Sequence, residues 1–325
     1  MTPANDPAAG DDRAVAPKTI LVVSFSQSGQ LDRIVESLLA PLRTAGHDIV
    51  VEHLAPTERY PFPWSVGEFL DVFPEAFRGI PCSLAPLKTP SDRRYDLIVL
   101  AYQVWYLAPS IPIASFLQSA EARQLLRNTP VVSIVGCRNM WLRAHDVVKG
   151  YLRAAHACLA GHIVLTDRAY HLVSVITILY WMLTGRQNRL LGLFPKPGVA
   201  DADIAQCSAY GRLIADALAA PAFPDLQDRL NALSACRVVP HLMALENRAV
   251  RVFDIWSKIL LRKGRRGDAA RRPAVRVFGW YLGLAVALFS PLSFCMFYLT
   301  LPFRRAAVHR QIEQVHLNSP LTVHD

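Results

Sequence analysis

The sequence has few charged residues and no cysteine pair of the kind that binds zinc. Charged side chains make up 19% of the 325 residues and apolar ones 52%, a composition too apolar for a disordered chain or a coiled coil. The six cysteines form no C-x-x-C motif, so we expect ordinary thiols in a reducing compartment. A disulfide scaffold and a structural zinc domain are disfavoured, and no His, Asp or Glu pair stands at metal-ligand spacing.

An apolar targeting segment is also missing at the N-terminus. Residues 1–17 are rich in Ala, Pro and Asp and contain no apolar core of a signal peptide. We therefore expect a disordered leader, followed by a catalytic part in the cytoplasm.

Excess positive charge is confined to the last third of the chain. Up to Cys236 there are 21 basic and 21 acidic residues, and from Arg237 onward there are 14 basic and 5 acidic ones. Proteins that bind nucleic acid carry such charge on a folded reading surface, whereas here it flanks an apolar segment. The pattern favours an anionic membrane surface as a partner and argues against nucleic acid.

Apolar strands alternate with amphipathic helices between residues 18 and 220. Runs rich in β-branched residues predict five strands, at 19–25, 48–54, 96–102, 130–136 and 162–166. Helical periodicity predicts helices at 31–46, 112–125, 141–159, 172–184 and 201–219. This alternation is typical of an α/β domain with a doubly wound, five-stranded parallel sheet.

One connection is too long for this pattern. Residues 55–95 contain seven prolines and several aromatic residues, and connections of this length are usually functional or disordered. The aromatic residues argue for order. We expect either a lid that faces a substrate or an excursion that covers an edge of the sheet.

The last third resembles a membrane-binding tail. Residues 237–276 form a basic, amphipathic region, and residues 277–303 are 27 consecutive uncharged residues with aromatic residues near both ends. About 20 apolar residues suffice to cross the hydrocarbon core, and a buried core helix is the alternative. We predict a spanning helix or a re-entrant hairpin, followed by a tail at 304–325, that anchors the domain at the inner cell membrane.

Three loops follow predicted strands at the edge where a parallel sheet binds its ligands. The first is Ser26-Gln27-Ser28-Gly29-Gln30, which places hydroxyl residues and a glycine before a helix N-terminus, as suits an anion. It lacks the lysine of a Walker A loop and the glycine fingerprint of a dinucleotide fold. We expect a phosphate monoester here rather than ATP or NAD, with a plain helix cap as the alternative.

The second loop follows the third predicted strand, and the third loop follows the fourth. The second presents two adjacent aromatic rings that can stack on a planar ligand. In the third, Arg138 can stabilise an enolate or a reduced ring, and Asn139 can bond a carbonyl or a ring edge. Core positions for the tryptophans and an ion pair for the arginine are the alternatives. The candidate ring-binding residues are Val104, Trp105, Tyr106, Leu107, Cys137, Arg138, Asn139, Met140 and Trp141.

A candidate for proton transfer comes directly after the third loop. His145 lies at the start of the next predicted helix, where it can give or take a proton during catalysis together with Arg138 and Asn139. A structural role on a surface helix is the alternative.

The segments that carry these loops resemble a flavodoxin. LVVSFSQSGQLDRIVESL is similar to that family's phosphate loop and first helix, and YDLIVLAYQVWYLAPSIPIASFL resembles its first ring-binding loop. Ser26, Ser28 and Gly29 match the family's hydroxyl-x-hydroxyl-glycine positions, while Leu31 stands where the family usually keeps Ser or Thr. The resemblance covers residues 19–165 and implies FMN as the cofactor, with one phosphate hydrogen bond fewer.

A narrower resemblance concerns PFPW at 61–64, VWYLAPSIP at 104–112 and GCRNMWLRA at 136–144. These motifs look like those of the dialkylresorcinol condensing enzymes, flavodoxin-like proteins of bacterial gene clusters for resorcinol lipids, flexirubin and aryl-polyene pigments. In that family a ketosynthase joins two acyl chains, and the flavodoxin-like member is assigned the aromatisation of the cyclohexanedione product. The resemblance implies an FMN-dependent aromatase with a lipid-like substrate and a ketosynthase as partner.

Three other functions stay open on the sequence. A flavin-dependent NAD(P)H:quinone reductase would oxidise NAD(P)H, which an aromatase does not need. A membrane-tethered flavodoxin that carries electrons is disfavoured because carriers are usually acidic on their docking face, and the globular part has no net charge. The third is a scaffold on a flavodoxin frame that binds no flavin.

Overall fold

The computed structural model describes residues 16–219, 223 and 225–316. Most of the leader predicted at residues 1–17 lies outside the described residues, as do residues 317–325 of the predicted tail.

A parallel sheet forms the centre of the chain, in the order β2-β1-β3-β5-β6. Its parallel strands are β1 (Thr19–Ser24), β2 (Asp48–His53), β3 (Leu97–Trp105), β5 (Pro130–Cys137) and β6 (Cys158–Thr166). A sixth strand, β4 (Ala108–Pro109), pairs antiparallel with the end of β3. The prediction of five strands was therefore wrong by one, because two residues are too few to leave a periodic pattern. The order reverses between β1 and β3, as in flavodoxin-like sheets.

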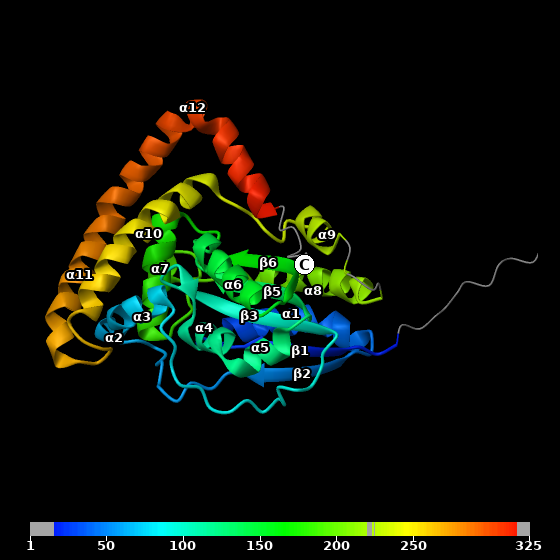
Figure 1. The fold of residues 1–325 in the computed structure, drawn as a ribbon. Coiled ribbons are helices and arrows are strands. Elements are labelled where there is room, and N and C mark those ends of the chain that lie inside the picture. The colour runs from blue at the N-terminus through cyan, green and yellow to red at the C-terminus, as the bar shows by residue number, and fades with distance from the viewer. Residues whose placement is uncertain (1–15, 220–222, 224, 317–325) are drawn as a thin grey trace, which may run out of the picture.

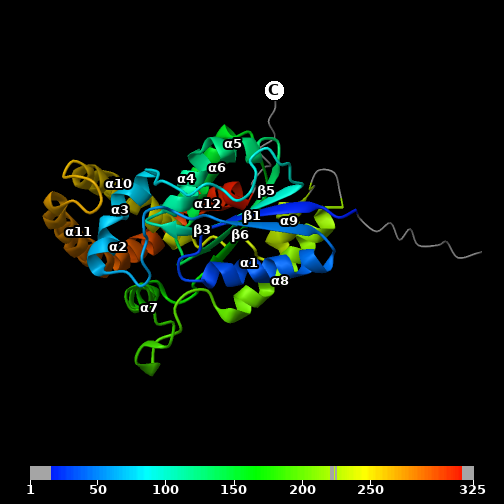
Figure 2. The same ribbon diagram turned by 90° about the horizontal axis from the view of Figure 1, so that it is seen from below.

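Helices cover both faces of this sheet (Figures 1 and 2). One face carries α1 (Gln30–Thr44), α8 (Asp201–Ala217) and α9 (Leu226–Ala232). The other carries α4 (Ile111–Gln118), α5 (Ala120–Leu126) and α6 (Leu142–Ala154). Side chains of β1 alternate between the two, since Ile20 and Val22 pack under the first group and Leu21 and Val23 under the second. The predicted doubly wound α/β fold is confirmed.

Two predicted helices have different bounds. The helix expected at 112–125 is divided at Ser119, whose hydroxyl accepts a hydrogen bond from the amide of Ala122 and so begins α5. The helix expected at 141–159 ends at Ala154, because His156 adopts a left-handed backbone conformation with φ of 54°. The chain then enters β6.

The proline-rich insert at 55–95 is ordered and contains two short helices. These are α2 (Val66–Asp71), which begins with a capping box between Ser65 and Glu68, and α3 (Phe73–Arg78). Helix α2 contacts α11, and α3 contacts α10 and β4. The insert thus joins the edge of the sheet to the C-terminal helices.

The remaining helices lie mainly at one end of the sheet, and the last part of α12 turns back to contact α9. They are α7 (His171–Thr184), α10 (Pro240–Leu261), α11 (Arg272–Leu284), the π-helical turn η3 (Ala285–Phe289) and α12 (Ser290–His316), with single turns η1 (Leu190–Gly192) and η2 (Ala269–Arg271). The region predicted to be basic and amphipathic, residues 237–276, contains α10 and the start of α11. Figure 1 shows α11 and α12 beside α10, with α12 bent into two arms and Pro302 inside it.

The predicted apolar segment is one long helix. Residues Ala269–Phe303 form 35 helical residues that are apolar enough to cross a membrane. Its most apolar window is only 17% buried, so it is not a core helix of this chain.

Candidate functional site

The loop after β1 leads into helix α1, and no side chain in the described part of the chain caps the N-terminus of this helix. Gly29 is the N-cap residue, with φ of 80°, a conformation that glycine adopts without strain. The first amides of a helix have no partner within the helix and can bind an anion. The hydroxyl oxygen of Ser26 is buried and has no hydrogen-bond partner among the described residues. A phosphate group would satisfy both sets of donors.

Two glutamines hold this loop in place. The side chain of Gln27 donates to the carbonyl oxygen of Pro61 at 2.9 Å, which ties the loop to the insert. Gln30 donates to the carbonyl oxygen of Val199 at 3.2 Å and accepts from its amide at 3.0 Å. Gly198 permits this approach, because a Cβ there would lie 2.6 Å from Oε1 of Gln30. Gln30 is therefore occupied by the chain before α8.

Leu31, the departure from the flavodoxin pattern, points into the core. Its side chain is 1% exposed and belongs to the apolar cluster under α1. A Cβ added at Gly136 would lie 3.5 Å from its Cδ1 and 3.1 Å from that of Ile34. Position 31 thus contributes packing at the floor of the site, and Ser26 and the helix amides remain as the phosphate donors.

The second loop is a two-residue turn between β3 and β4. Tyr106 and Leu107 both have positive φ, 49° and 63°, which in this turn usually requires Asn or Gly and costs other residues about 1–2 kcal/mol each. The hydroxyl of Tyr106 donates to the carbonyl oxygen of Phe69 at 2.6 Å, and Arg143 donates to that of Leu107 at 2.9 Å. Tertiary contacts therefore hold the strained turn, as is common at ligand sites.

Aromatic rings surround Trp105 on one side of the site. Its ring meets those of Phe25, Tyr60 and Trp64 edge-on, at centroid distances of 5.9, 5.3 and 5.8 Å. The indole nitrogen of Trp64 is buried without a hydrogen-bond partner among the described residues. Burial raises the pKa of Tyr60, so its hydroxyl stays protonated. This wall can pack against a flat ring.

The third loop brings a cation and an amide to a histidine that we did not predict. Nη1 of Arg138 and Nδ2 of Asn139 each lie 3.4 Å from Nδ1 of His171. Because both neighbours are donors, Nδ1 accepts and the proton resides on Nε2. Burial and the charge of Arg138 lower the pKa of His171 to about 3, while burial lowers that of Arg138 to about 10. At neutral pH the pair is a neutral imidazole beside a guanidinium cation.

Trp141 and His145 lie away from this site. Both are 2% exposed, and the ring of His145 stacks on that of His162 at 3.6 Å with Trp141 against both. Burial lowers the pKa of His162 well below its usual value. Neither Trp141 nor His145 lines the cavity described below. The position of His145, in the core under α6, gives no support to its predicted role in proton transfer.

The three loops open into one large cavity of about 1550 Å³. Pockets for small molecules usually measure roughly 300–1,000 Å³, so this one has room for a cofactor and a second ligand. The predicted residues that line it are Gln27, Ser28, Gln30, Val104, Trp105, Tyr106, Leu107, Cys137, Arg138 and Met140. Ser26, Gly29 and Asn139 are adjacent in sequence to these residues but do not themselves line the cavity. Burial raises the pKa of Cys137, which therefore stays a thiol.

The rest of the cavity wall comes from segments that the sequence did not associate with the loops. Trp64 and Phe69 come from the insert, and mainly apolar side chains come from α7, α10, α11, η3 and α12. The buried hydroxyl, the uncapped helix and the aromatic wall fit FMN. Among the described residues, no group of three His, Cys, Asp or Glu side chains could hold a metal ion.

Comparison with known proteins gave matches to solved structures alone. No protein-family model matches the chain, and no curated protein does. A flavoprotein from Lactobacillus acidophilus NCFM, solved in complex with FMN, is 18% identical, with a TM-score of 0.33 over 46% of this chain and 91% of that one. A flavodoxin from the domain Archaea is 12% identical, with a TM-score of 0.34 over 62% of this chain and 98% of that one. The fold assignment rests on the strand order described above.

Proposed function

We propose that this chain is a membrane-associated, FMN-dependent oxidoreductase that aromatises an alkylated cyclohexanedione to a dialkylresorcinol. The observation that carries the proposal is the convergence of three loops, after β1, β3 and β5, on one cavity that is larger than a cofactor needs. A ketosynthase would supply the substrate, and the inner cell membrane would be the location.

The phosphate of FMN would lie against the N-terminus of α1. Ser26 and Ser28 would donate hydroxyl hydrogen bonds, and the first amides of α1 would add theirs. The ring would lie between the turn at Tyr106–Leu107 and the loop at Arg138. FMN, when bound, supplies a two-electron acceptor.

Arg138 and His171 would bind the oxygen atoms of the substrate. Conversion of a cyclohexane-1,3-dione to a resorcinol removes two electrons and two protons, and it is easiest from the enolate. The guanidinium of Arg138, cationic at neutral pH, stabilises an enolate oxygen, and Nε2–H of His171 can donate to the second oxygen. A quinone or dioxygen would reoxidise the cofactor.

A quinone reductase is the second candidate. The apolar walls that α7 and α11 give to the cavity would receive a quinone as well as a dialkyl dione. An electron carrier is less consistent with the cavity, because a carrier needs an exposed ring edge, whereas helices surround the predicted ring position here.

Anaerobic mixing separates the candidates. The full chain, loaded with FMN, is mixed with a dialkyl cyclohexane-1,3-dione or with NADPH, and flavin absorbance and product mass are followed. We expect the dione to bleach the flavin and to yield one resorcinol per flavin. Arg138→Met should keep FMN but slow bleaching by about 100-fold. Arg168→Met, a change at an exposed arginine that pairs with Asp203 and does not line the cavity, should leave the rate unchanged. Bleaching by NADPH alone would identify a reductase instead.

A further inference from the structure

The start of the long apolar helix forms ion pairs and ring contacts with the proline-rich insert. Arg271 is fully buried, and its Nε lies 2.8 Å from a carboxylate oxygen of Asp71, while its Nη1 lies 2.6 Å from one of Glu75. Two turns further on, the ring of Phe278 stacks on that of Phe73 at 4.3 Å. The first part of the helix is thereby fixed to α2 and α3.

The middle of the same helix forms hydrogen bonds and ring contacts with α10. Arg248 donates to the hydroxyl of Ser293. His241 receives the edge of the Phe294 ring at a centroid distance of 4.9 Å, and its Nδ1 lies 3.1 Å from the hydroxyl of Tyr298. One side of α11 and α12 is therefore occupied by protein along most of its length.

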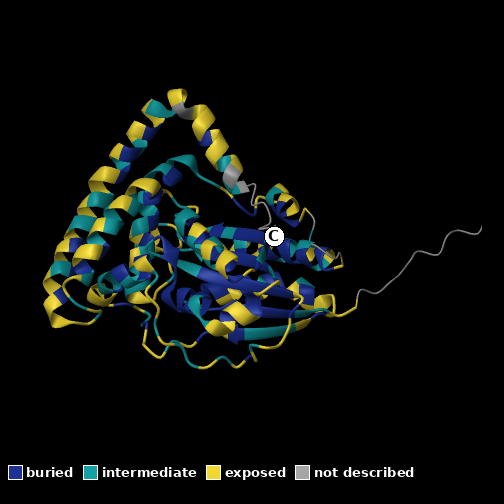
Figure 3. Cartoon of the chain, viewed as in Figure 1, coloured by how far each residue is buried: buried dark blue, intermediate teal, exposed yellow. Residues whose placement is uncertain are grey.

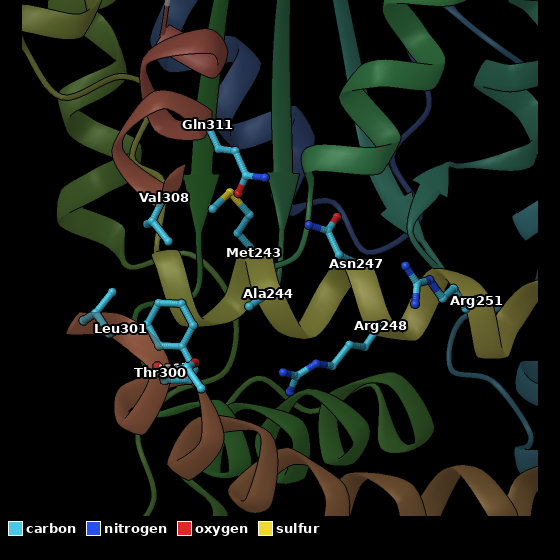
Figure 4. A pocket seen from close by; sticks show the side chains of 10 residues that line it. Met243, Ala244, Asn247, Arg248, Arg251, Thr300, Leu301, Val308 and Gln311 are labelled. Carbon is cyan, nitrogen blue, oxygen red and sulfur yellow. Dashed lines mark hydrogen bonds between the residues drawn. The ribbon is translucent and has the colours of Figure 1, made fainter. Parts of the chain in front are cut away.

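Helix α10 is too polar to enter the hydrocarbon core of a membrane. Its charged residues are Glu246, Arg248, Arg251, Asp254 and Lys258. Between α10 and α12 lies a pocket of about 280 Å³ in which Asn247, Arg251 and Gln311 take part (Figure 4). Such groups find no partners in hydrocarbon. A helix attached to α10 cannot be surrounded by lipid in the way that a spanning helix is.

The opposite side of α11 and α12 is an exposed apolar stripe. Its members recur every three or four residues and are Val277, Trp280, Leu284, Leu288, Leu292, Met296, Leu299 and Phe303. Trp280 is 84% and Phe303 91% exposed, and Figure 3 shows exposed residues along this side. The stripe extends for about 40 Å along the helix, and nothing in the described chain covers it.

Exposed basic residues lie beside both ends of the stripe. Arg265, Arg272 and Arg276 are at its start, and Arg305 and Arg310 follow its end. Cations next to an apolar helix face that contains Trp are typical of a helix in the plane of an anionic membrane surface. A second copy of the chain fits less well, because either orientation would set basic ends against each other.

We propose that α11, η3 and the first arm of α12, up to Phe303, lie flat in one leaflet of an anionic bilayer, without crossing it, and that the cavity opens toward this leaflet. Trp280, Phe289 and Met296 are both exposed and part of the cavity lining, as are Ile176 and Leu179 of α7. The mouth of the cavity therefore lies on the apolar surface, and an apolar ligand can pass between leaflet and cavity without crossing water. This rests on the membrane association proposed above but not on FMN.

Topology is tested with cysteines on either side of the apolar stretch. Ala270 and Ala307 are exposed, and each is replaced by Cys in a Cys295→Ser background, since Cys295 is itself exposed. In inside-out membrane vesicles from expressing cells, a membrane-impermeant maleimide should label both sites fully. Protection of A307C until detergent is added would show a spanning helix and overturn the proposal.

The depth of spin labels in the bilayer distinguishes a helix that lies flat from a re-entrant hairpin. Spin labels at L284C, L292C and L299C should report the same shallow depth in vesicles, within about 10 Å of the headgroups. A depth that increases and then decreases along the stripe would show a hairpin.

Flotation with lipid vesicles tests whether a membrane or a second copy of the chain covers the apolar stripe. Purified protein should float with vesicles of roughly 70% phosphatidylcholine and 30% phosphatidylglycerol. Leu288→Glu should weaken binding by about 10-fold, whereas Leu233→Glu, an exposed leucine at the end of α9, should not. Dimerisation without flotation would show that a second copy covers the stripe. FMN content of the same samples is measured separately, so loss of the cofactor and loss of membrane binding are distinguishable.

Discussion

Replacing Arg271 with methionine should detach the long apolar helix from the insert. The arginine is 0% exposed and faces two carboxylates, those of Asp71 and Glu75, whose side chains are 18% and 14% exposed. Its Nη2 also donates to the carbonyl oxygen of Asp71 and lies 2.8 Å from Oε2 of Glu75. Methionine fills the space but leaves both carboxylates without their cation.

The cost follows from the burial of this cluster. Removal of one partner of a buried ion pair typically destabilises by about 3–5 kcal/mol, a large fraction of a total stability of roughly 5–15 kcal/mol. The loss can be relieved locally if α11 separates from α2 and α3 and the carboxylates reach water. We therefore expect local opening at α11 before the sheet unfolds.

Limited trypsin digestion measures the local opening at α11, and thermal unfolding measures the stability of the sheet. R271M should be cut within residues 262–276 roughly 100-fold faster than the parent, because a loss of about 3 kcal/mol raises the population of locally open forms by about that factor. Arg272→Met, the exposed neighbour, is the matched control and should behave like the parent. The triple variant R271M/D71N/E75Q should recover most of the loss. If R271M resists trypsin as well as R272M, the ion-pair cluster does not hold α11.

Three further predictions concern single positions. Gly198→Ala should weaken FMN binding and lower stability by about 1–3 kcal/mol, because its Cβ would meet Gln30 in a backbone conformation with φ of +88°; an unchanged FMN titration and denaturation midpoint would contradict this. Burial raises the pKa of Glu246 to about 7 from 4.5, so the folded state binds the proton more tightly, and the free energy of unfolding should fall by about 3 kcal/mol as pH rises from 4.5 through 7. In denaturation curves the parent should therefore be more stable at pH 5 than at pH 8, and Glu246→Gln should reduce this difference. Tyr106→Phe leaves the carbonyl oxygen of Phe69 without its donor and should cost about 1 kcal/mol in urea denaturation; a gain in stability would show that the turn does not depend on this bond.

The layers of the fold could be predicted because buried strands are apolar runs and helices with one buried side repeat apolar residues every three or four positions. The apolar run at 19–25 and the i, i+3, i+4 spacing from Leu31 to Leu42 correspond to β1 and α1 within two residues. Strand β4 could not be predicted, since its turn uses Tyr106 and Leu107, which carry no turn signal. Their positive φ depends on bonds to Phe69 and Arg143, residues that only the folded chain brings near.

The site could be predicted in part, for a related reason. The loops after β1, β3 and β5 meet because the carboxyl ends of parallel strands share one edge. His171 was missed because it begins an otherwise uncharged helix far along the chain, and only its approach to Arg138 marks it. The role of His145 in proton transfer stays a prediction, and the side chain lies with Ala144, Val148 and Leu152 on the buried face of α6.

The composition of residues 277–303 does not distinguish a membrane-spanning helix from a helix that packs on the protein along one side. Its length fits a membrane span, but Phe278 and Ser293 point toward the protein on the opposite side from Trp280 and Leu288. A mean hydropathy cannot distinguish a helix with one packed side from one that is apolar all round.

The most direct test of the account is an FMN titration of the purified full chain, with an absorption spectrum and mass spectrometry of what heat releases. We expect flavin bands, one FMN per chain, and an affinity reduced by about 10-fold in Ser26→Ala, because a hydrogen bond to a charged group contributes about 1.5–3 kcal/mol. Ser208→Ala on α8, whose hydroxyl donates to the carbonyl oxygen of Ala205 in the same helix, should bind as the parent does. A colourless protein that does not bind added FMN would show that the chain is not a flavoprotein and would favour a flavin-free scaffold.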